Sequence, residues 1–241
     1  MRYGIISDIH SNLEALQAVL AACRQESVEK LFCVGDVVGY GANPSECIDL
    51  MGELNIACVA GNHDWAVCGL IDYDDFRDEA RIAVDWTKKV LSSKYMDFLK
   101  SLALTFATDE FVMVHGTLSE PGAFHYLYDI ARAQETFELM DRTICFVGHT
   151  HKPQIFVKQK DIVSLAPLMK INLNSAFKYI VNVGSVGQPR DSNPMASFCI
   201  YDSDLKCVEI KRVAYDIQAA QKKIMDAGLP QMLALRLSVG R

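Results

Sequence analysis

Short apolar runs alternate with amphipathic stretches over the first sixty residues. Residues 3–7, 31–34 and 56–60 are runs of the length and composition expected for buried strands. After a capping-box pattern that begins at Ser11, apolar side chains recur at helical spacing. A second helix is expected to begin at Asn43-Pro44, because proline suits the first helical position. This strand, helix, strand, helix, strand order predicts a parallel sheet with right-handed crossovers.

Further along the chain the pattern stays mixed. Residues 80–91, 92–102 and 130–140 are predicted helices, and 104–108 and 111–114 are predicted strands of a hairpin that turns at Asp109-Glu110. After residue 151 the segments become short and rich in β-formers, which predicts an antiparallel second sheet from residues 155–157, 162–165, 179–183, 197–201 and 208–213. A closing helix over 217–227 ends at Gly228 and Pro230. Because no linker-like segment interrupts the chain, we expect one domain over residues 1–241.

The bulk composition narrows the possible partners. The 241-residue chain is half hydrophobic with a formal net charge of −6, which argues against non-specific binding of duplex nucleic acid. A small anionic substrate remains compatible, since bound metal ions would reverse the local field. The eight cysteines include no C-x-x-C pair, and the N-terminus enters a strand at once with no apolar run of membrane-spanning length. We therefore expect a cytoplasmic protein without a membrane partner.

Five of the apolar runs end in residues of the types that commonly bind metal ions in proteins. These ends read Asp8-Ile9-His10, Gly35-Asp36, Gly61-Asn62-His63-Asp64, His115-Gly116 and Gly148-His149-Thr150-His151. Ligands of open α/β sheets bind at the carboxyl ends of strands, so these side chains would converge if the runs are neighbours. Imidazoles with carboxylates and an amide oxygen suit Mn, Fe, Zn, Co or Ni. The set is too large for one ion and suits two, with a carboxylate between them. Asp36 is the candidate bridge, because it stands alone at its strand end.

Such a pair of ions has a well-defined chemistry. Two ions roughly 3.5–4 Å apart clamp the attacking and leaving oxygens of a displacement at phosphorus, and they supply hydroxide near neutral pH. The leaving alkoxide still needs a proton. His63, held by the carboxylate of Asp64, is the candidate donor.

In order and spacing, the five motifs resemble those of the calcineurin-like metallophosphoesterases, over residues 1 to about 152. The resemblance implies a four-layer α/β/β/α sandwich with a dinuclear centre of divalent transition-metal ions, manganese being expected ahead of Fe, Zn, Ni or Co. It also implies a phosphoesterase that uses a metal-bridging hydroxide, with His63 and Asp64 as the acid pair. The implied ligand set is Asp8, His10 and His151 on one ion, Asn62, His115 and His149 on the other, and Asp36 bridging.

One departure from the family pattern bears on the substrate. Residues 37–41 follow Asp36 where protein serine/threonine phosphatases and diadenosine tetraphosphatases have an Asp-Arg-Gly whose arginine clamps phosphate. Small phosphodiesters or phosphomonoesters are therefore the first expectation, and a protein-phosphatase-like or diadenosine-tetraphosphatase-like hydrolase is the alternative. A scaffold without activity would be expected to lose His63 or some ligands, and this chain keeps them all.

Three features outside the motifs have open roles. Arg190, in the glycine-rich segment 184–190, could replace the missing clamp or lie in a hairpin near the surface. Tyr40 could stack on a substrate base or cover apolar surface. His125 and its loop, residues 117–129, could pack or line the site. The physiological substrate, the native metals and the oligomeric state stay open.

Overall fold

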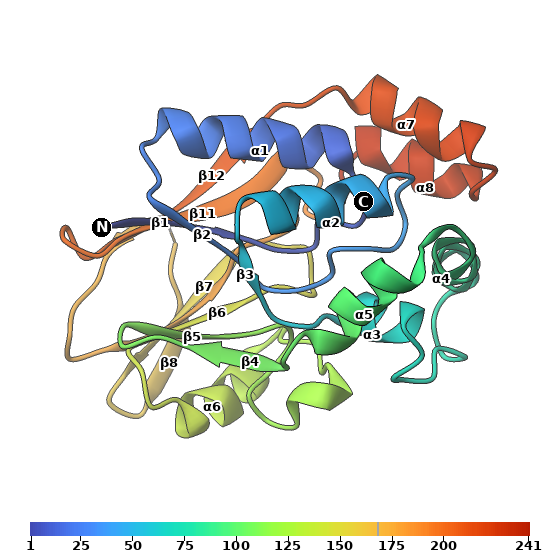
Figure 1. The fold of residues 1–241 in the computed structure, drawn as a ribbon. Helices are drawn as coiled ribbons and strands as arrows, with labels where there is room; N and C mark the ends of the chain where they lie inside the picture. The colour runs from blue at the N-terminus through green and yellow to red at the C-terminus, as the bar shows by residue number, and fades with distance from the viewer. Residues whose placement is uncertain (168) are drawn as a thin grey trace.

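Two mixed β-sheets pack face to face between outer layers of helices (Figure 1). The computed structural model describes residues 1–167 and 169–241, and these form two six-stranded sheets. The first sheet has the order β3 (Ala57–Cys58), β2 (Lys30–Cys33), β1 (Arg2–Ile6), β11 (Ala196–Asp202), β12 (Cys207–Val213), β9 (Lys170–Asn172). The second has the order β4 (Thr105–Ala107), β5 (Phe111–Val114), β6 (Ile144–Val147), β10 (Lys178–Asn182), β7 (Gln154–Gln159), β8 (Ile162–Leu165).

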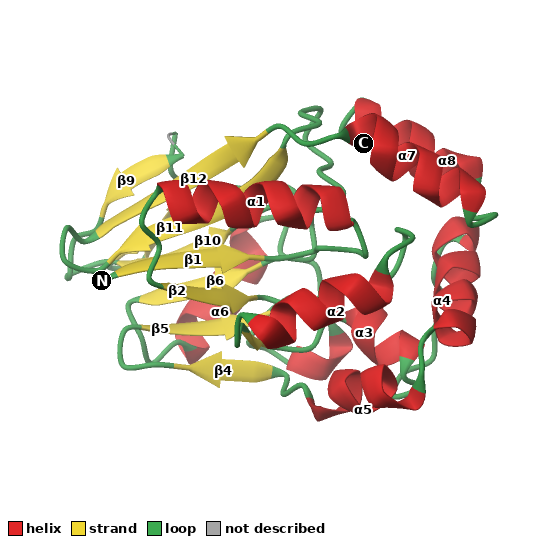
Figure 2. Ribbon diagram, turned by 45° about the horizontal axis from the view of Figure 1, so that its top comes forward, coloured by secondary structure: helices red, strands yellow, loops and turns green. Residues whose placement is uncertain are grey.

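Helices cover the outer faces of both sheets and one end of the sandwich (Figure 2). Helix α1 (Leu13–Gln25) and α2 (Pro44–Glu53) lie on the first sheet, and α6 (Ile130–Leu139) lies on the second. The remaining helices are α3 (Asn62–Val67), α4 (Asp78–Val90), α5 (Ser93–Ser101), α7 (Ile217–Asp226) and α8 (Gln231–Leu235), with 3₁₀ turns η1 (Pro121–Ala123) and η2 (Arg236–Ser238). Within the described ranges, no helix is both long and apolar enough to cross a bilayer.

The space between the sheets is filled by aromatic and branched side chains. Phe32 of the first sheet meets Phe111 of the second edge to face, with ring centroids 5.1 Å apart, and Ile5 and Phe146 belong to the same fully buried cluster. On the outer faces, α1 and α6 bury their own apolar stripes, which include Leu16 on α1. The α/β/β/α sandwich that the resemblance implies is therefore confirmed.

The local elements largely match the predictions. Strands β1, β2 and β3 are parallel, α2 begins at Pro44, and β4 and β5 form the predicted antiparallel hairpin. The N-cap of α1 is Asn12, within the capping-box pattern that begins at Ser11, and its side chain accepts the Ala15 N–H at 3.1 Å. After Gly61 the chain forms the short helix α3, which the apolar pattern did not predict.

The predicted division into an N-terminal parallel sheet and a C-terminal antiparallel sheet is wrong. Strands β7, β8 and β10 join β4, β5 and β6, whereas β9, β11 and β12 join β1, β2 and β3. β10 even runs parallel to β6. Local apolar patterns identify strands, but they do not determine which strands pair, because pairing depends on contacts between segments far apart in the chain. One domain over 1–241 stays a prediction.

Candidate metal centre

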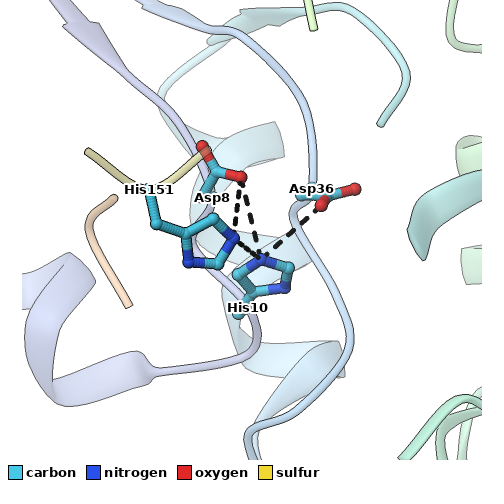
Figure 3. Close-up of side chains that lie close together, drawn as sticks. All are labelled: Asp8, His10, Asp36 and His151. Carbon is cyan, nitrogen blue, oxygen red and sulfur yellow. Dashed lines mark hydrogen bonds and ion pairs between the residues drawn. The ribbon is translucent and has the colours of Figure 1, made fainter. Parts of the chain in front are cut away.

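The polar ends of β1, β2 and β6 bring one group of ligands together. Asp8, His10, Asp36 and His151 are buried, and their side chains point at one another (Figure 3). The Nε2 atoms of His10 and His151 lie 3.1 Å apart, Asp8 Oδ1 lies 3.3 Å from His151 Nε2, and Asp36 Oδ2 lies 3.5 Å from His10 Nε2. All four donor atoms fall within 4.8 Å of one another, which is a suitable spacing for a shared cation.

A second group adjoins the first and shares Asp36 with it. Asp36 Oδ2 lies 3.2 Å from His115 Nε2, which in turn lies 3.1 Å from His149 Nδ1. Asn62 lines the same cleft as His149, and its buried Oδ1 has no hydrogen-bond partner among the described residues; the same holds for Asp36 Oδ2. Buried acceptors are rarely left unpaired, so these two oxygens fit cation binding. The predicted bridge is thus the residue common to both groups.

Backbone carbonyls orient three of the imidazoles. The Nδ1 atoms of His10, His115 and His151 donate to the carbonyl oxygens of Val38, Val34 and Gln188, at 3.0, 2.7 and 2.6 Å. Each bond fixes the tautomer and turns Nε2 toward the centre. His149 instead presents Nδ1 to the centre. The ring orientations of His10, His115 and His151 are therefore fixed by the fold.

The turns that carry these ligands are held in an unusual backbone conformation. Asp8, His10, Asp36, His149 and His151 all have positive φ, between 49° and 67°. This left-handed region is unfavourable for residues with a Cβ, by up to about 1–2 kcal/mol each. Main-chain hydrogen bonds between the turns hold it, such as Asp8 N–H to Gly35 O and His10 N–H to Asp36 O, both 3.0 Å. Strain that tertiary contacts maintain is common at functional sites.

Glycine is required where the turns approach the carboxylates. A Cβ on Gly61 would lie 2.0 Å from Asp36 Oδ1, and one on Gly148 would lie 2.6 Å from Asp8 Oδ2. We expect Gly61→Ala to displace Asp36, to destabilise the fold by about 1–3 kcal/mol, and to weaken manganese binding at least about tenfold. Thermal unfolding and metal titration measure the two effects.

A matched control is available on α2. A Cβ on Gly52 meets nothing within 4 Å, so Gly52→Ala should keep manganese affinity and leave stability equal or up to about 1 kcal/mol higher. Wild-type manganese affinity in Gly61→Ala would show that the position of Asp36 is not critical.

Electrostatics also favour a cation here. Burial raises the pKa of Asp8 to about 7. Burial opposes charge on Asp36 and His115 as well, yet their attraction outweighs it: the pKa of Asp36 lies well below its usual range, and that of His115 rises to about 10. Burial lowers the pKa values of His10, His149 and His151, so these rings are neutral and available as ligands. The negative charge of the buried Asp36 carboxylate can be balanced by a proton or by a metal ion on His115 Nε2.

His63 lies beside the ligands on the first turn of α3. Its ring packs against Tyr40 and His10, at centroid distances of 4.5 and 4.9 Å, and its backbone N–H donates to Asp36 Oδ1 at 2.9 Å. Nδ1 has no hydrogen-bond partner among the residues described. Burial lowers the pKa of His63 to about 4, so the ring is neutral at pH 7 and carries one N–H that can donate.

The predicted pairing of His63 with Asp64 requires correction. Asp64 Oδ1 accepts the N–H groups of Val37 and Val38 at 2.9 and 3.2 Å, and Oδ2 accepts that of Gly61 at 3.0 Å. Consecutive residues of a helix point in different directions, so Asp64 cannot face the ring of its neighbour. Its carboxylate instead holds the Asp36 turn against the start of α3.

A cleft of about 770 Å³ opens on this centre, and Asn62, His63 and His149 line it. Tyr40 and Arg190 line it too, with the Arg190 guanidinium carbon 5.5 Å from the centre of the Tyr40 ring. Segment 184–190 is not a surface hairpin: it is mostly buried, and the Val186 and Gly187 N–H groups donate to the carbonyls of Ser7 and Asp8 at 2.9 Å.

The loop at 117–129 forms one wall of the cleft. Tyr126 stacks on His149 with centroids 3.9 Å apart, and Tyr128 stacks on Tyr126 at 5.0 Å. The third residue of interest in this loop, His125, pairs instead with Glu120: its Nε2 lies 3.4 Å from Glu120 Oε2. Of the two roles left open for this loop, the structure shows the lining one for Tyr126 and Tyr128, whereas sequence reasoning missed the cleft residues Arg77, Arg236 and Arg241.

Comparison with known proteins identifies the family. The family model for the calcineurin-like phosphoesterase superfamily domain matches residues 1–206. The chain belongs to this superfamily. An uncharacterised protein of Methanocaldococcus jannaschii is 43% identical over 242 residues, which cover 99% of this chain and 98% of the relative. The superfamily's members are hydrolases of phosphate esters, and the buried His/Asp cluster of this member is suited to divalent metal ions.

Solved structures agree with this assignment. A metallophosphoesterase from Sphaerobacter thermophilus is 37% identical with a TM-score of 0.88, and the match covers 100% of this chain and 99% of that one. A hypothetical protein from Pyrococcus horikoshii is 19% identical with a TM-score of 0.82, covering 100% and 98%. At 19% identity, the similarity to the Pyrococcus horikoshii protein supports the fold and nothing beyond it.

Proposed function

We propose that this superfamily member hydrolyses small phosphodiesters or phosphomonoesters at a dinuclear metal centre. The observation that carries the proposal is the sharing of Asp36 by two buried ligand groups, with Asn62 Oδ1 left without a partner among the described residues. Asp8, His10 and His151 would hold one ion, Asn62, His115 and His149 the other, and Asp36 both. Bound ions would lower the pKa of water and neutralise charge on the phosphate.

The other groups of the cleft have assignable tasks. His63 is the proposed hydrogen-bond donor to the leaving oxygen in the transition state, since its ring lines the cleft beside the ligands. Arg190 is the proposed phosphate clamp. Its Nε and Nη2 donate to the neutral Gln188 Oε1 at 3.1 and 2.7 Å, so the bonds leave its positive charge uncompensated. With a net charge of −6 on the chain, we propose a small phosphorylated substrate in place of duplex nucleic acid.

The test uses metal-stripped protein with and without added manganese. Turnover of bis-p-nitrophenyl phosphate and p-nitrophenyl phosphate is compared, because one is a diester and the other a monoester. We expect manganese-dependent turnover that the chelator EDTA abolishes. Preference for the diester would make the protein a phosphodiesterase, and preference for the monoester a phosphatase. No turnover of either ester by the metal-loaded protein would contradict the proposal and favour the non-catalytic scaffold.

A further inference from the structure

The cleft beside the metal centre carries more positive charge than one phosphate ester needs. Its lining includes five cationic residues and two acidic ones, Asp72 and Asp75. The cationic residues are Arg77, Lys152, Arg190, Arg236 and Arg241. Within residues 1–167 and 169–241, no Asp or Glu carboxylate pairs with them within 4.0 Å, and the one carboxylate that does contact them is the main-chain carboxylate of Arg241, which accepts from Arg236. This clustering of positive charge in one cleft contrasts with the formal net charge of −6 of the whole chain.

Arg236 occupies a distinctive position in this group. It lines the metal-side cleft and also an adjoining groove of about 600 Å³ between α4 and the C-terminal segment, so it lies where the two meet. Figure 2 shows α8 beside the end of α4. Arg236 follows α8 directly and lies outside the part of the chain that the family model matches.

The Arg236 side chain is held and directed into the cleft. Its Nε donates to a main-chain carboxylate oxygen of Arg241, the last residue of the sequence, whereas neither Nη atom has a hydrogen-bond partner among the described residues. Burial, together with the nearby charge of Arg190, lowers the pKa of Arg236 to about 10. Arg212 offers a contrast, because both of its Nη atoms donate, one to the Met195 carbonyl and the other to the Asp191 carboxylate.

We propose that Arg236 binds a second anionic group of the substrate, while Arg190 and the metal centre bind the scissile phosphate. The inference rests on the proposed function. The preferred substrate class is then a phosphoester that carries a further phosphate or carboxylate to one side of the bond that breaks. Two half-buried guanidinium groups in one cleft repel each other, and a substrate with two anions relieves that repulsion.

The experiment compares two diesters that differ only in one phosphate. Thymidine 5′-(phenyl phosphate), with and without a 3′-phosphate, is used to inhibit manganese-dependent turnover of bis-p-nitrophenyl phosphate. We expect the 3′-phosphorylated compound to have an inhibition constant about tenfold lower in the wild type. Arg236→Gln should reduce the difference to less than about threefold, and Arg236→Lys, which keeps the charge, should retain most of it.

Arg132→Gln is the matched control, because Arg132 lies on the exposed face of α6 and pairs with Glu135; it should keep the full preference. No preference in the wild type, or an unchanged preference in Arg236→Gln, would overturn the inference while leaving the proposed function in place. If bis-p-nitrophenyl phosphate is not turned over, the proposed function fails instead. Calorimetric binding of the two thymidine esters then tests Arg236 separately.

Discussion

Asp36→Asn is expected to weaken manganese binding at both positions of the centre, by at least about 100-fold. Asp36 Oδ2 faces His10 Nε2 and His115 Nε2, which belong to different ligand groups. Asparagine keeps an oxygen that can accept the His63 backbone N–H, so the backbone turn at residue 36 should keep its conformation. It lacks the negative charge of Asp36, so it should bind manganese poorly. Manganese titration by calorimetry and metal content after dialysis measure the effect.

Asp8→Asn provides the comparison, because Asp8 belongs to the first ligand group and not to the second. We expect that variant to lose one ion while Asp36→Asn loses two. Equal metal content in the two variants, or wild-type content in Asp36→Asn, would exclude Asp36 as the bridge.

His63→Ala is expected to lower kcat by about 10²- to 10⁴-fold while both ions stay bound. His63 is buried beside the centre and lines the cleft, but its contacts with the ligands are ring packing and a main-chain bond to Asp36. Steady-state turnover of bis-p-nitrophenyl phosphate, measured with metal content on the same sample, tests the two parts of this expectation.

The control for His63 is the one histidine outside the motifs. His125 pairs with Glu120 at the edge of the loop, so His125→Ala should change kcat by less than about twofold. Loss of metal in His63→Ala would make His63 a ligand, and full activity would remove it from the mechanism.

The sequence determined the strands, most helices and the kinds of ligand atoms. Apolar runs predicted β1 and β2, and Pro44 predicted the start of α2, because burial periodicity and capping are local properties. The metal-binding residue types at strand ends were equally visible, and their order was sufficient to indicate the superfamily.

Tertiary structure decided the rest, because it depends on contacts between distant segments. Which strands share a sheet followed from pairing across the chain, as in β10 beside β6. The Asp64 carboxylate became a support for the Asp36 turn because helix geometry turned it away from His63. The cleft brings Tyr126 and Arg236, 110 positions apart in the sequence (236 − 126), to one metal centre. No local sequence pattern predicts that these two residues line the same cleft, because their proximity depends on how the C-terminal segment packs against α4.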